Sequence, residues 1–100
     1  MTTATKVIHP GQIIRLKLQI MGIGISKAAR ALGISRTHFS DIVNGQAGIS
    51  ASMALRLSLG IGGTAEEWLL HQMNYELDLA RENFLTISRQ VQELKKGASQ

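Results

Sequence analysis

Residues 25–44, ISKAARALGISRTHFSDIVN, decide the fold of this chain. On either side of Gly33, apolar and small residues recur three and four positions apart, which is the period of an α-helix. Gly33 can end the first helix and Ser35 can cap the second. Two helices joined by a short turn that contains glycine cross at a steep angle and suit DNA binding. The apolar and small positions are Ala28, Ala29, Leu32, Ile34, Phe39, Ile42 and Val43.

The second of these helices has an apolar back and a polar front. Phe39 and Ile42 are predicted to pack inward, so that the N-terminal end of the helix can enter the major groove of DNA. Arg36 is the expected guanine reader, because its fork of donors can bond two acceptors on one base. The alternative is a solvated arginine near a helix cap. The predicted DNA-binding residues are Lys27, Ser35, Arg36, Thr37, His38, Ser40, Asp41 and Asn44.

Each of the other candidates has an expected partner. Thr37 and Ser40 can contact a thymine methyl, a base edge or a phosphate, and His38 a phosphate or a base. Asp41 can accept from cytosine or orient Arg36. Asn44 ends the helix and is expected to stabilise the turn more than to touch DNA.

Charge is unevenly distributed along the chain. The formal net charge is +4, but residues 1–65 hold seven Lys/Arg against one Asp, while residues 66–100 hold four basic and six acidic residues. The basic part coincides with the two-helix motif, as contact with phosphate requires. Lys6, Arg15, Lys17 and Lys27 are candidates for phosphate contacts, although each can also be a plain surface residue. Arg56 can equally be structural.

The sequence predicts an all-α protein with five helices and no strands. Residues 1–8 are expected to form a loose arm, and residues 9–80 a helix-turn-helix domain whose first helix begins at Pro10. Ser50 can cap a fourth helix with an apolar face of Met53, Ala54 and Leu57. Thr64 and Glu67 form a capping box that opens a fifth helix, in which no Pro or Gly follows until Gly97.

The fifth helix carries a long apolar seam with heptad spacing. Residues 70–80 are expected to cover the domain. Residues 81–100 extend past a domain of this size, so they either fold back or pair with a second copy of the chain, and pairing is favoured. The seam is Leu70, Met73, Leu77, Ala80, Phe84, Ile87, Val91 and Leu94, and the last four are the predicted dimerisation residues.

Several kinds of site are not indicated. The chain has no cysteine, and its three histidines have no ligand spacing, so no metal or other cofactor is expected. The glycines at 60, 62 and 63 lack the strand and lysine of a phosphate-binding loop. No catalytic set of residues is present, and we expect no enzyme. Without a leader or a long apolar run, the chain is expected to be cytoplasmic and not bound to a membrane.

The chain resembles the Cro/repressor-like (XRE) helix-turn-helix proteins, and within them the HigA/VapI-type antitoxins. The resemblance implies a dimeric repressor of double-stranded operator DNA that also neutralises a HigB-like, mRNA-cleaving toxin. It rests on His9-Pro10-Gly11, Ala28-Ala29-Arg30-Ala31-Leu32-Gly33-Ile34-Ser35-Arg36, Asn44-Gly45, Gly48-Ile49-Ser50, Met53-Ala54-Leu55-Arg56-Leu57, Glu67-Trp68-Leu69, Gln72 and Tyr75.

Two positions depart from the family pattern. The family usually caps the first motif helix with Ser or Thr, where this chain has Gly24, and related repressors often follow with a backbone-gripping Gln, where this chain has Ile25. These departures support one alternative, a protein-interaction module with weakened DNA binding. A repressor without a toxin is a second, separate alternative.

Overall fold

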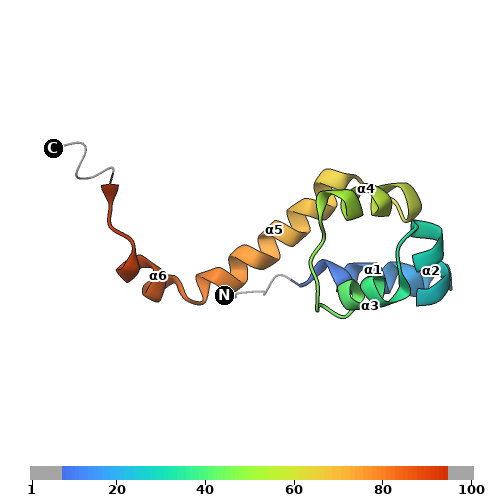
Figure 1. Cartoon of the computed structure of the whole chain (residues 1–100), viewed down its shortest axis with the longest axis horizontal. Helices are drawn as coiled ribbons and strands as arrows, with labels where there is room; N and C mark the ends of the chain where they lie inside the picture. Colours follow the sequence, from blue (N-terminus) through green and yellow to red (C-terminus); the bar gives the residue numbers. More distant parts are fainter. Residues whose placement is uncertain (1–7, 95–100) are drawn as a thin grey trace.

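The computed structural model describes residues 8–94, and this part of the chain contains six α-helices and no strand (Figure 1). The first four helices gather at one end of the molecule, and α5 leads away from them toward α6 (Figure 1). The helices are α1 (Pro10–Met21), α2 (Ile25–Leu32), α3 (Arg36–Val43), α4 (Ala51–Gly60), α5 (Ala65–Arg81) and α6 (Phe84–Gln90). None of these helices is long and apolar enough to cross a membrane.

A single apolar core joins α1 to α4 and the start of α5. Helix α3 packs on both α1 and α2, and α4 packs on α2 and α5. The predicted back of α3 is confirmed, because Phe39 and Ile42 are fully buried. The small residues Ala28 and Ala29 of α2, which belong to the apolar period of the motif, are also buried. The core is Ile14, Leu18, Ala28, Ala29, Leu32, Phe39, Ile42, Val43, Ile49, Met53, Ala54, Leu57 and Trp68.

The start of α1 is fitted closely against the end of α3. His9 caps α1 with its ring nitrogen Nδ1, which accepts a 2.8 Å hydrogen bond from the Gly11 backbone nitrogen. A Cβ atom at Gly11 would lie 2.1 Å from the Ile42 carbonyl oxygen and 2.8 Å from that of Val43. Only glycine permits this approach, which fixes where α3 ends relative to α1.

The first half of α5 is anchored by specific polar contacts. The predicted capping box of Thr64 and Glu67 is present. The Trp68 indole, 3% exposed, packs in the core and donates a 2.9 Å hydrogen bond to the Gly62 carbonyl. Gln72 accepts a 2.9 Å hydrogen bond from the Ile49 backbone nitrogen, and the Tyr75 ring meets the His9 ring edge-on at 4.8 Å. The Gln72 bond holds α5 against the loop that follows α3, and the Tyr75 contact holds it against the start of α1.

The prediction that residues 70–80 cover the domain is wrong for the seam residues within that range. Leu70, Met73 and Leu77 are 51%, 47% and 40% exposed. The residues that meet the domain lie on the other face of α5, because the polar anchors Gln72 and Tyr75 direct that face inward. The apolar seam therefore begins to be exposed at Leu70.

The prediction of one uninterrupted helix to Gly97 is also wrong. Helix α5 ends at Arg81, and Asn83, with φ −107° and ψ 22°, leaves the helical conformation before α6 begins. The last turn tightens into bonds from Glu82 to Leu79 and from Asn83 to Ala80. Asparagine is a weak helix former, and a helix without tertiary packing is marginal in water. Within the described part, the chain becomes extended at Val91. Gly97 and residues 1–7 of the predicted arm at 1–8 lie outside the described residues.

Candidate nucleic-acid interface

The turn between α2 and α3 is held by backbone geometry and by one arginine. Gly33 has φ +74°, and the Ile34 backbone nitrogen donates to the Ala29 carbonyl at 3.1 Å, which closes a left-handed helix cap. From α4, Arg56 Nη1 donates to the Leu32 carbonyl at 2.8 Å and to the Gly33 carbonyl at 3.3 Å. Arg56 is therefore a structural residue, because its guanidinium bonds carbonyls that the helix end leaves unpaired.

Helix α3 begins at a side-chain cap and presents a polar face. The Ser35 hydroxyl accepts a 3.1 Å hydrogen bond from the His38 backbone nitrogen, as predicted for an N-cap. The side chains of Arg36, Thr37, His38 and Asp41 are exposed. The buried residues of α3 fix the helix from behind, so this face has a defined position on the domain.

A hydrogen-bonded network links α1 to the end of α3. Arg15 Nη2 donates to Asn44 Oδ1 at 2.5 Å, and Asn44 Nδ2 donates to Ser40 Oγ at 3.2 Å. Ser40 is half-buried, whereas Asn44 is exposed, and Gly45 follows with φ +78°. The stabilising role expected of Asn44 thus includes a bond to another helix. The link to Arg15 does not follow from the sequence, because no local pattern connects residues 29 positions apart.

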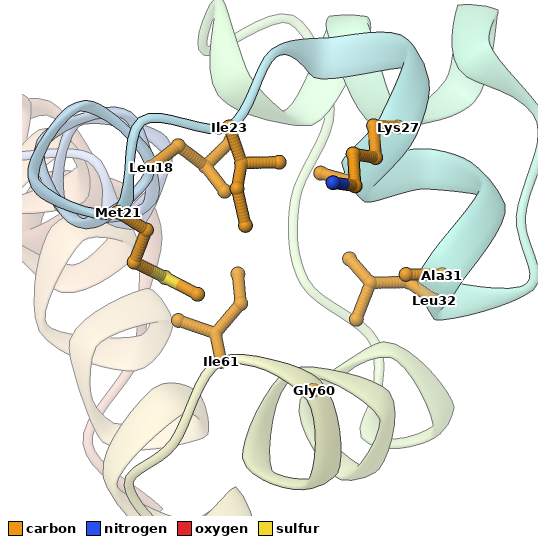
Figure 2. A pocket seen from close by; sticks show the side chains of 9 residues that line it. Leu18, Met21, Ile23, Lys27, Ala31, Leu32, Gly60 and Ile61 are labelled. Carbon is orange, nitrogen blue, oxygen red and sulfur yellow. The ribbon is translucent and has the colours of Figure 1, made fainter.

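The start of α2 differs from the start of α3. Gly24 is the N-cap of α2 and provides no side-chain cap hydrogen bond, and Ile25 is half-buried. Lys27 is exposed. Its side chain lies at the edge of an apolar pocket of about 70 Å³ between the ends of α1, α2 and α4, with its nitrogen directed toward the pocket (Figure 2). The stem of Lys27 can cover this apolar surface while its ammonium group stays in water. The apolar side chains around the pocket are Leu18, Met21, Ile23, Leu32 and Ile61.

The exposed charges on this part of the molecule are almost all positive. Between residues 8 and 65, the exposed charged residues are all basic except for one acidic residue, Asp41. Such a surface attracts phosphate over a distance of about 8–10 Å at physiological salt. The exposed basic residues are Arg15, Lys17, Lys27, Arg30, Arg36 and Arg56.

The histidines occupy three different environments. His38 is exposed on α3, and His71 meets the edge of Trp68 at 6.3 Å. Burial lowers the pKa of His9 from its usual range, while a backbone hydrogen bond with Ala47 and the Glu76 carboxylate act in the opposite direction. An unprotonated Nδ1 is what allows His9 to cap α1.

The crossed helices, the glycine turn and the exposed polar face of α3 define a helix-turn-helix protein. No protein-family model matches the chain. The chain is 40% identical to virulence-associated protein I of Dichelobacter nodosus over 82 residues, which are 81% of this chain and 76% of that protein. A second match from the same organism, to virulence-associated protein A', is 44% identical over 70 residues and spans 69% of this chain and 61% of that protein.

Solved structures show the same arrangement. Antitoxin GraA is 36% identical, with a TM-score of 0.84 over 91% of this chain and 100% of that chain. Pseudomonas aeruginosa antitoxin HigA, solved with higBA promoter, is 37% identical, with a TM-score of 0.81 over 89% of this chain and 99% of that chain. The chain belongs to the HigA-type antitoxins of the XRE helix-turn-helix family.

Proposed function

We propose that this protein is an antitoxin that binds operator DNA through α3 and represses transcription of its own operon. The observation that carries the proposal is the polar face of α3, fixed by its buried residues and surrounded by exposed basic side chains. The HigA structure solved with promoter DNA supports it, because that chain shares this fold over almost all of its length.

Within this proposal the residues of the interface have different tasks. Arg36 and Thr37, on the first turn of α3, contact base edges, whereas Lys27 contacts the phosphate backbone of the DNA. Asp41 orients Arg36 or accepts from cytosine, and His38 contacts a phosphate or a base. Ser35 contributes by holding the N-terminus of α3, since its hydroxyl is already a cap.

The functional unit is a homodimer that pairs through the C-terminal segment. Phe84, Ile87, Val91 and Leu94 are 62%, 43%, 62% and 81% exposed in the single chain. A second copy would bury these side chains and would place two α3 helices on successive major grooves, about 34 Å apart. The neutralised partner is a HigB-like, mRNA-cleaving toxin, an assignment that rests on family membership.

Two experiments test the two halves of the proposal. A duplex is first selected from a random-sequence library by the parent protein, and its affinity is compared with that of an unrelated duplex of the same length. An antitoxin-repressor prefers the selected duplex at least 10³-fold, whereas equal affinities would contradict specific repression.

The toxin is sought as a small basic reading frame beside this gene. Its expression alone should arrest growth, and co-expression of this chain should restore growth and give a complex that copurifies. If this chain does not relieve the toxicity of the neighbouring gene product, it is a repressor without an antitoxin role.

A further inference from the structure

The amide of Asn44 can have only one orientation in its network. A guanidinium group donates hydrogen bonds and accepts none, so the atom that faces Arg15 must be the oxygen Oδ1. Because the guanidinium of Arg15 is charged, its short contact with Asn44 Oδ1 is a charge-assisted hydrogen bond. The other end of the amide, Nδ2, is then a donor, and it lies 3.2 Å from Ser40 Oγ.

This orientation decides what the Ser40 hydroxyl can offer. Its oxygen accepts from Asn44 Nδ2, so its own proton points elsewhere. No group within residues 8–94 accepts that proton. Ser40 lies four residues after Arg36 and three after Thr37, so the three side chains share one face of α3. The hydroxyl therefore shows a hydrogen-bond donor on the face proposed to meet DNA.

We infer that Ser40 donates to a hydrogen-bond acceptor on DNA, and that Asn44, oriented by Arg15, is the positioning residue that directs the Ser40 proton away from the end of α3. This inference rests on the proposed DNA-binding function and deepens it. Purine N7, guanine O6, thymine O4 and phosphate oxygens are acceptors, whereas adenine N6 and cytosine N4 are donors. Ser40 thus favours an acceptor at its position, because its proton has no acceptor within residues 8–94.

Ser40→Ala and Asn44→Asp test the inference together. Ser40→Ala removes the donor and should weaken binding to the selected duplex about fivefold, the effect of one neutral hydrogen bond. Asn44→Asp keeps the shape but supplies a group that only accepts, so the Ser40 hydroxyl turns inward. The added charge also repels DNA, but that effect is the same whether or not Ser40 is present.

The informative readout is therefore the effect of Ser40→Ala in two backgrounds. In the parent it should cost about fivefold, and in Asn44→Asp it should cost nothing further. The same factor in both backgrounds would overturn the inference. Far-ultraviolet circular dichroism and thermal unfolding of every variant ensure that folded proteins are compared.

Arg15→Ala separates positioning from direct phosphate contact. A positioning Arg15 makes the Ser40→Ala effect smaller in the Arg15→Ala background and leaves the salt dependence of binding unchanged. A phosphate-contacting Arg15 leaves the Ser40→Ala factor unchanged and reduces the salt slope by about one unit, which would overturn the role assigned to Arg15.

Binding to the unrelated duplex shows whether the acceptor belongs to a base or to a phosphate. If Ser40 donates to a base, Ser40→Ala weakens only the selected duplex, and if it donates to a phosphate, both duplexes lose affinity. An unchanged affinity for both overturns the inference while the proposed function stands. A parent protein that binds no duplex overturns the proposed function and this inference with it.

Discussion

His9 connects three parts of the domain through one imidazole ring. Its Nδ1 caps α1, its ring packs on Tyr75 of α5, and a backbone hydrogen bond joins it to Ala47 in the loop after α3. The ring is 7% exposed. Because protonation of Nδ1 would convert the cap acceptor into a donor, the fold favours the neutral ring.

The stability of the protein should therefore fall as the pH is lowered past the usual histidine range. The unfolded chain binds a proton at His9 at about pH 6.5, whereas the folded chain resists until a lower pH. The contribution is fully present above about pH 6.5 and is lost as the pH falls through the folded pKa. Thermal unfolding from pH 7.5 to 5.0 measures this slope.

His9→Asn provides the control for that slope. An amide oxygen can still accept from the Gly11 nitrogen at every pH, although the contact with Tyr75 is lost. The variant should be less stable at pH 7.5 but should depend less on pH than the parent does. An equal slope in both proteins would assign the effect to other groups.

Single residues also show what the sequence could and could not predict. Helix caps follow from local spacing. Ser35 caps the start of α3, and Thr64 together with Glu67 caps the start of α5. Arg56 and Arg15 act on groups 23 to 29 positions away, so only the packing of the helices reveals their partners.

At the scale of elements, the motif depends on the turn between α2 and α3. Gly33 has φ +74°, and a Cβ there would lie 2.8 Å from Arg56 Nη1, which bonds the carbonyls of this turn. Gly33→Val should thus disturb both the backbone and the arginine.

Gly22→Val is a matched control for Gly33→Val. Gly22 also ends a helix with φ +70°, but a Cβ there meets nothing within 4 Å. Both substitutions should destabilise the domain, each by at least about 1 kcal/mol from the left-handed conformation. Gly33→Val should cost about 1 kcal/mol more, because it also displaces a hydrogen bond. Equal losses in urea unfolding would show that the Arg56 contact contributes nothing.

The helices were predictable to different degrees. The positions of α1 to α4 are predictable from caps, glycines and apolar periods in the sequence. These helices pack into one core, as the sequence indicates. The end of α5 did not, because heptad spacing describes which residues share a face and not whether another surface covers that face. Leu70 and Met73 have the same spacing as core residues, yet the polar anchors turn them outward.

At the scale of the whole molecule, the exposed apolar side chains of the C-terminal segment call for a partner. Soluble monomers rarely expose a large contiguous apolar patch. Each large side chain contributes about 1.5–3 kcal/mol when it is fully buried. The proposed pairing would bury side chains of Phe84, Ile87, Val91 and Leu94 that are exposed in the single chain.

Combined Ile87→Asp and Val91→Asp substitutions should give a folded monomer. Specific DNA binding should fall much further than non-specific binding, because two linked half-site contacts become one. Sedimentation equilibrium measures the mass. Thr86→Asp combined with Gln90→Asp is the control, since it adds the same charge beside the seam and should stay dimeric. A dimer that survives the first pair of substitutions would place the interface elsewhere, for example on the exposed face of α5.

If the exposed face of α3 reads DNA, Arg36→Ala should weaken sequence-specific binding. Fluorescence anisotropy compares the selected and unrelated duplexes, with Arg89→Ala on α6 as a control that loses the same charge. We predict a loss of about 1–3 kcal/mol on the selected duplex for Arg36→Ala, with relaxed preference at one base pair, and little change for Arg89→Ala. An Arg36→Ala protein that binds the selected duplex as tightly as the parent would show that α3 is not the DNA-reading helix.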